Sequence, residues 1–145
     1  MAGSTNDGPV RDMYLRWTQQ SGGYDSLSSF HDMLSEYTIP ATTRPEGFVD
    51  PYREFLTDNC RVFFSHADLT PTNIILAGLP GERRISSVID WEQAGWYPEY
   101  WEYCKLNIGC PYKHEWRSEG WVDKVMQVYH DELYALGEYW QIRPP

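Results

Sequence analysis

The chain has 145 residues, 41% of them hydrophobic and 16% aromatic, so it holds enough apolar material for a single domain with one core. Asp and Glu number 21 and Lys and Arg number 12, and the net charge of −9 opposes binding to nucleic acid or anionic lipid. The sequence has no apolar run of about 18 residues and no signal peptide, which predicts a cytoplasmic protein that does not span a membrane.

The cysteines indicate neither a disulfide framework nor a zinc site. Cys60, Cys104 and Cys110 are odd in number and lack C-x-x-C spacing. We therefore expect three reduced thiols.

The first part of the chain is predicted to be helical after a polar, extended lead-in of about a dozen residues. Residues 12–20 could form a short helix that ends at the glycines of residues 21–23. Residues 25–40 give a clearer helix, since apolar side chains recur there at helical spacing and Asp25 or Ser26 can cap the first turn. A second amphipathic helix is expected from Pro51 to Thr57 or Asp58.

The hydrophobic pattern then changes to that of short β-strands. "RVFFSH" at residues 61–66 and "NIILA" at residues 73–77 lie on either side of a turn that contains proline. "RISSVIDW" at residues 84–91 follows "GLPGE" at residues 78–82, whose glycines suit a hairpin.

Beyond Gly95 the pattern again predicts helices. "PEYWEYCKL" starts with Pro98, a residue that suits the first turn of a helix. Residues 120–140 place six apolar side chains along one helical stripe, namely Val122, Val125, Val128, Tyr129, Leu133 and Leu136.

Between these elements lies a set of polar residues with the spacing that phosphoryl transfer requires. That reaction needs a carboxylate beside the attacking hydroxyl and oxygen ligands that hold Mg²⁺ against the nucleotide phosphates. Asp68 suits the first role. Asn73, five positions later, and Asp90, which the hairpin returns toward the loop, suit the second.

These residues resemble the second lobe of the aminoglycoside phosphotransferase and choline kinase group of protein-kinase-like enzymes. In that family the catalytic loop reads H-G-D-x-x-x-x-N and the metal-binding Asp lies in I-D-W or I-D-F; the matching stretches here are "HADLTPTN" and "VIDWE". "QAGWYPEYWEYCKL" and "GGYDSLSSFHDML" are similar to fungal members. The likeness covers about residues 8–108 and implies ATP and Mg²⁺ as cofactors, with Asn73 and Asp90 on the metal.

Two departures from the family pattern stand out. Ala67 replaces the usual Gly of the loop, which we read as a small change. In addition, the 65 residues before His66 contain no Gly-rich loop, no strand Lys and no partner Glu, so we expect the ATP-binding first lobe to be absent and phosphoryl transfer to be impaired.

The remaining candidates surround the catalytic loop. His66 is assigned to the catalytic set with Asp68, and a loop-bracing role is favoured over proton transfer. Trp91, Glu92 and Trp96 could line a ligand pocket, although aromatic side chains at helical spacing more often fill a core.

The sequence predicts a mainly α, α+β fold, equivalent to the helical lobe of a kinase-like protein with a small β-hairpin, as one domain over residues 1–145. Two functions remain open. One is transfer of phosphate from ATP to a small-molecule hydroxyl; the other is a repurposed single lobe that binds a small molecule or carries out acid–base or cyclisation chemistry on an apolar metabolite. We also expect the surface that a first lobe would cover to self-associate or bind a partner protein.

Overall fold

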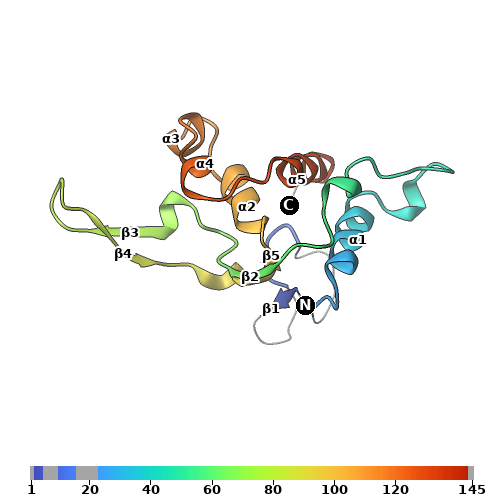
Figure 1. The fold of residues 1–145 in the computed structure, drawn as a ribbon, viewed down its shortest axis with the longest axis horizontal. Helices are drawn as coiled ribbons and strands as arrows, with labels where there is room; N and C mark the ends of the chain where they lie inside the picture. Colours follow the sequence, from blue (N-terminus) through green and yellow to red (C-terminus); the bar gives the residue numbers. More distant parts are fainter. Residues whose placement is uncertain (1, 5–9, 16–22, 144–145) are drawn as a thin grey trace.

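The computed structural model describes residues 2–4, 10–15 and 23–143, which form a mixed α+β structure (Figure 1). The helices are α1 (Leu27–Thr38), α2 (Trp101–Gly109), α3 (Glu115–Ser118), α4 (Trp121–Val125) and α5 (His130–Ile142). The strands are β1 (Gly3–Ser4), β2 (Val62–Ser65), β3 (Ile74–Ala77), β4 (Arg84–Val88) and β5 (Gly95–Pro98).

Helix α1 confirms the helix predicted for residues 25–40. Ser26 is its N-cap: the Ser26 hydroxyl accepts a hydrogen bond from the Ser29 backbone N–H, and the Ser29 side chain accepts one from the Ser26 N–H. This capping box satisfies backbone donors that have no partner within the helix. The buried face of α1 includes Phe30, His31 and Leu34.

The helix predicted from Pro51 to Asp58 is wrong. Only Arg53–Phe55 forms a 3₁₀ turn, and Leu56 returns to an extended backbone. A segment this short does not hold a helix by local propensity. Burial of Leu56, which is 2% exposed, instead draws the chain into the core.

Two antiparallel sheets form the β part of the fold. The first has the order β1-β5-β2 and the second is the predicted β3–β4 hairpin, which projects from the body of the molecule in Figure 1. Strand β5 was not predicted, and Pro98 lies in this strand rather than in the first turn of a helix. Its pairing runs from Val62 opposite Pro98 to Ser65 opposite Gly95, so long-range strand pairing overrides the local helix signal.

The single helical stripe predicted over residues 120–140 is also wrong, because the chain breaks between α4 and α5. Met126 has an extended backbone, and Tyr129 precedes the first residue of α5. Met126, Val128 and Tyr129 all pack against the core. Burial of the link lets α4 contact α2 while α5 packs against both α1 and α2.

Three other sequence predictions have their outcome here. Residues 12–15 form a turn closed by Leu15 N–H to the Asp12 carbonyl, and the rest of the proposed helix over residues 12–20 lies outside the described residues. Cys60, Cys104 and Cys110 are free thiols, as expected. No helix in the described part of the chain is long and apolar enough to cross a membrane.

The core is aromatic and contains one fully buried imidazole. The His31 ring lies between Asp58, whose Oδ1 is 2.7 Å from Nδ1, and the Tyr100 hydroxyl, which is 2.7 Å from Nε2. These distances fit a neutral ring that donates from Nδ1 to Asp58 and accepts from Tyr100. Burial lowers the pKa of His31, and the hydrogen bond with Asp58 opposes this shift only in part.

The lowered pKa of His31 predicts a pH-dependent stability. Between the folded pKa and the ordinary value of about 6.5, the unfolded chain binds more protons, so the free energy of unfolding falls as the pH drops through this window. His31→Gln retains a donor and an acceptor but does not titrate. Urea unfolding at several pH values between neutral and mildly acid should show a shallower dependence for the variant, and identical slopes for both proteins would contradict the assignment.

Candidate active site

The catalytic-loop candidates Asp68 and Asn73 are joined directly. Asn73 is buried, and its Nδ2 donates to the Asp68 carbonyl oxygen at 2.8 Å and to the Asp68 carboxylate at 3.2 Å. A 3₁₀ turn over Pro71–Asn73 brings the amide back toward Asp68. Because both contacts use the side-chain amide nitrogen, the side-chain oxygen Oδ1 of Asn73 is turned away from Asp68.

His66 braces this loop with both of its ring nitrogens. Nδ1 accepts from the Asp68 backbone N–H at 3.2 Å, and Nε2 donates to the Ile89 carbonyl at 2.9 Å. The two bonds require the neutral tautomer with its proton on Nε2. They support the bracing role that the sequence favoured, since neither nitrogen is left to exchange a proton with a substrate.

Ala67 has a left-handed backbone with φ of +62°, in a fully buried position. A residue that carries a Cβ is strained at this φ by roughly 1–2 kcal/mol. Ala in place of Gly in this loop is therefore a larger change than the small one expected from the sequence. The Ala67 N–H donates to Oε2 of Glu102 at 3.0 Å, which holds the strained residue against α2.

Asp90 reaches the loop through the hairpin. The Ile89 N–H donates to the backbone carbonyl of Asn73 at 2.9 Å. The residue before Asp90 is therefore bonded to the backbone of Asn73, whose side chain is the other proposed metal ligand. Asp90 also has a left-handed backbone, with φ of +65°, and its exposed carboxylate does not cap the following 3₁₀ turn. Among the residues that the structure describes, Ala67 and Asp90 are the two non-glycine residues with positive φ, and both lie at this loop.

The donor set fits a hard divalent cation. Asn73 offers an oriented amide oxygen and Asp90 a solvent-facing carboxylate, and Mg²⁺ prefers such ligands while keeping several waters. The described residues contain no cluster of three or more His, Cys, Asp or Glu side chains that could hold a metal by themselves. The assignment of Asn73 and Asp90 to a metal stays a prediction.

The proposed pocket residues lie in an exposed aromatic row beside the loop. Trp91 stacks on Phe64 at 6.2 Å and lies 4.6 Å from the His66 ring, and Phe64 also meets Trp96 edge to face. Trp91 lines a cavity of about 420 Å³ together with His66 and Glu102. Oε1 of Glu102 is buried and has no hydrogen-bond partner among the described residues. Glu92 is exposed, and its ligand role stays a prediction.

Exposed apolar side chains extend from this row onto the hairpin. They are Phe63, Phe64, Trp91 and Trp96 near β2 and β5, and Ile75, Leu76, Leu79, Ile85 and Ile89 along β3 and β4. Such a surface suits contact with another polypeptide. Self-association or partner binding here stays a prediction.

A buried ion pair joins α2 to the turn at residues 12–15. Nζ of Lys105, on α2, lies 3.0 Å from Oδ2 of Asp12 and 3.2 Å from Oε1 of Gln93, and neither Lys105 nor Asp12 has an appreciably exposed side chain. Burial lowers the pKa of the Lys105 ammonium, and the Asp12 carboxylate opposes this shift. The Trp101 indole N–H also donates to Asp12, so the carboxylate is fully bonded.

A family model described as "Phosphotransferase enzyme family" matches residues 31–139. The chain belongs to the phosphotransferase enzyme family. Comparison with curated proteins and with solved structures found no significant match. The match spans all the loop residues described above and confirms the resemblance at the level of the family; a fungal origin and the presence of only the second lobe stay predictions.

Sequence reasoning missed the residues of this phosphotransferase-family chain that support the loop. Glu102 and Lys105 lie three positions apart on α2 and therefore on one helical face, which was the available signal. Their partners Ala67 and Asp12 are 35 and 93 positions away in the chain, so no local pattern could reveal the contacts.

The backbone at Ala67 gives a direct test of the loop geometry. Ala67→Val places a β-branched side chain at positive φ in a filled site, and we expect a loss of about 2–4 kcal/mol of unfolding free energy. Ala67→Gly should change stability by less than about 1 kcal/mol, because relief of strain offsets the added chain entropy. Ala77→Val in β3 is the matched control, since a strand accepts a β-branched residue. Urea unfolding checks all three, and equal stability of the two valine variants would contradict the geometry.

Proposed function

We propose that the chain is the helical, second lobe of a phosphotransferase and that its site transfers a phosphoryl group from ATP to a hydroxyl of a small molecule. In this reaction the hydroxyl oxygen bonds to the γ-phosphorus, and the bond from that phosphorus to the β–γ bridging oxygen breaks. ADP leaves, and the hydroxyl proton moves to the Asp68 carboxylate.

The observation that carries this proposal is the bonding of Asn73 to Asp68. The amide fixes the carboxylate of Asp68 from one side and directs its own carbonyl oxygen away from that carboxylate. A base held beside an oriented metal-ligand oxygen is the arrangement that phosphoryl transfer needs. Family membership supports the same reading.

Mg²⁺, when bound with ATP, neutralises charge on the phosphate oxygens. Asn73 and Asp90 would hold it. His66 keeps the loop in register by bonding both Asp68 and Ile89, and Ala67 is anchored by Glu102. These side chains position Asp68 and Asn73.

We further propose that the 145-residue chain is a slow enzyme by itself. The sequence has three lysines, all after Asp90, and Lys105 is committed to Asp12 and Gln93. In kinase-like enzymes the lysine that holds the nucleotide phosphates precedes the catalytic loop, and no lysine does so in this sequence, so such a lysine would have to come from elsewhere. Weak binding of Mg²⁺·ATP is the expected consequence.

Asp68→Asn tests the role of the base. With Mg²⁺·ATP and a mixed panel of small alcohols, we expect alcohol-dependent ADP formation to fall roughly 10²- to 10⁴-fold, because the amide cannot receive the hydroxyl proton. The variant should keep its fold, since an amide oxygen can still accept the bond from Asn73. Asp25→Asn, which removes an exposed carboxylate before α1, is the control. ADP formation that is unchanged in Asp68→Asn would refute the assignment.

A second function is favoured by an apolar cavity of about 400 Å³ next to the loop. In that alternative the lobe binds a small apolar metabolite, or acts on it by acid–base or cyclisation chemistry, without ATP. Binding of apolar compounds that is indifferent to Mg²⁺·ATP and to Asp90→Asn would favour it. The cavity is lined by Leu69, Ile74, Leu106, Trp116, Trp121, Val122, Val125 and Met126.

A further inference from the structure

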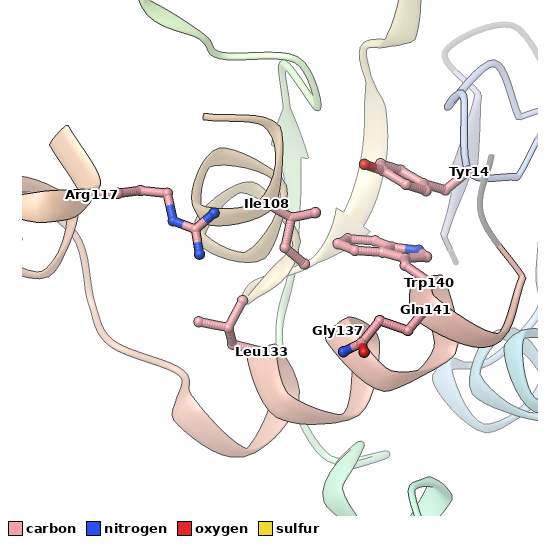
Figure 2. A pocket seen from close by; sticks show the side chains of 7 residues that line it. All are labelled: Tyr14, Ile108, Arg117, Leu133, Gly137, Trp140 and Gln141. Carbon is pink, nitrogen blue, oxygen red and sulfur yellow. The ribbon is translucent and has the colours of Figure 1, made fainter. Parts of the chain in front are cut away.

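A third cavity, of about 460 Å³, opens between α2, α5, α3 and the turn at residues 12–15 (Figure 2). One wall is the Tyr14 ring stacked on Trp140, with ring centroids 4.0 Å apart. Arg117 points in from the opposite side, and apolar side chains lie between them. The volume falls within the range of small-molecule sites. The described lining residues are Tyr14, Ile108, Arg117, Leu133, Gly137, Trp140 and Gln141.

This cavity and the catalytic loop lie against the same helix, α2. Ile108 of α2 lines the cavity, and the next residue, Gly109, lies close to Thr70 of the loop. A Cβ added at Gly109 would be 3.7 Å from Cγ2 of Thr70. Tyr14 lies over Lys105, whose Nζ is 4.3 Å from the ring centroid. Burial, followed by the carboxylates of Asp12 and Asp68, raises the pKa of the Tyr14 hydroxyl, which agrees with a position near Asp68.

The positive charge in the cavity belongs to Arg117, whose surroundings differ from those of the other half-buried arginines in the described ranges. Three arginines are half-buried within the described ranges, and two of them pair with carboxylates. Arg44 pairs with Glu36, and Arg53 pairs with Asp32 and Asp58.

Arg117 is the third, and no carboxylate of the described residues lies within ion-pair distance of it. Its polar contact is Nη1 to the Cys110 carbonyl at 3.3 Å, and its guanidinium lies 5.5 Å from the Tyr112 ring centroid. A partly desolvated guanidinium that keeps free donors favours an anionic partner.

We propose that this cavity binds the phosphoryl acceptor, and that the acceptor is a small anionic molecule with a flat ring and a free hydroxyl. Arg117 receives the carboxylate or an equivalent anion, and Trp140, Ile108 and Leu133 contact the ring. The hydroxyl then faces the loop that carries Asp68. The assignment of the ligand as acceptor rests on the proposed function; the preference for an anion rests on the cavity itself.

The lining also argues against a polycationic acceptor. No Asp or Glu is among the described lining residues, and the one ionised side chain is positive. An ammonium group placed there would lose water without gaining a carboxylate, which is costly. The apolar cavity beside Leu69 does not suit this ligand either, because its walls offer an anion no donor.

A charge series tests the proposal without nucleotide. Calorimetry on the intact chain compares para-hydroxymethylbenzoate, para-hydroxymethylbenzamide and para-hydroxymethylbenzylamine, which share the ring and the hydroxyl. We expect the carboxylate to bind about tenfold more tightly than the amide, with the amine weakest. The chain carries a net charge of −9, so general electrostatics would favour the amine, and a preference for the carboxylate must arise locally.

Substitutions at Arg117 and Arg61 test whether the preference for the carboxylate arises in this cavity. Arg117→Gln should reduce the carboxylate to the affinity of the amide and leave the amide unchanged, whereas Arg117→Lys should keep part of the preference. Arg61→Gln removes an exposed arginine that pairs with Glu99 and should change none of the affinities. The series on the unmodified chain does not depend on any variant folding.

The outcomes separate this inference from the proposed function. Equal affinity for the three compounds, preference for the amine, no binding by any of them, or a carboxylate preference that survives in Arg117→Gln would overturn the site. If the carboxylate binds through Arg117 but Mg²⁺·ATP never phosphorylates it under conditions where other alcohols are phosphorylated, the acceptor role fails and the anion site stands. If no alcohol is phosphorylated, the proposed function fails.

Discussion

The buried ion pair between Asp12 and Lys105 is the contact on which the arrangement of the site depends. It joins the turn at residues 12–15 to α2, and Gln93 bonds both the Lys105 ammonium and the Met13 backbone N–H. A buried charge that loses its partner costs roughly 3–5 kcal/mol, so these segments are held in place together. One helix face thereby positions two things: Lys105 fixes the turn that carries Tyr14, and Glu102 fixes the catalytic loop at Ala67.

This arrangement gives the two sides of α2 different tasks. Toward the loop, hydrogen bonds occupy both ring nitrogens of His66 and the side-chain amide nitrogen of Asn73. The proposed function assigns the remaining groups, namely the Asp68 and Asp90 carboxylates and the Asn73 amide oxygen, to the base and the metal ligands. Toward α5, the helix borders a cavity with an aromatic wall and a guanidinium that pairs with no carboxylate of the described residues. Under the proposed function, a loop held by hydrogen bonds beside a cavity is the arrangement that transfer to a small molecule requires. The strained backbones at Ala67 and Asp90 lie in the rigid part, where bonded neighbours hold them.

The sequence predicted what local spacing encodes. The capped helix α1, the β3–β4 hairpin and the return of Asp90 toward Asn73 all follow from short patterns, and so did the family. Strand β5 and the break before α5 were missed because pairing with β2 and burial of Met126 and Tyr129 are long-range effects. The positive φ at Ala67 was equally invisible, since alanine gives no sign of a left-handed backbone.

In the proposed function, Asn73 and Asp90 hold the metal of a nucleotide complex beside Asp68. Mn²⁺ takes the same oxygen ligands as Mg²⁺ and broadens NMR signals of nearby nuclei. We predict that substoichiometric Mn²⁺·ATP broadens the side-chain amide signal of Asn73 and spares that of Asn59, which precedes β2, and that Asp90→Asn abolishes the difference. Equal broadening of the two amides, or broadening at Asn73 that persists unchanged in Asp90→Asn, would contradict the account.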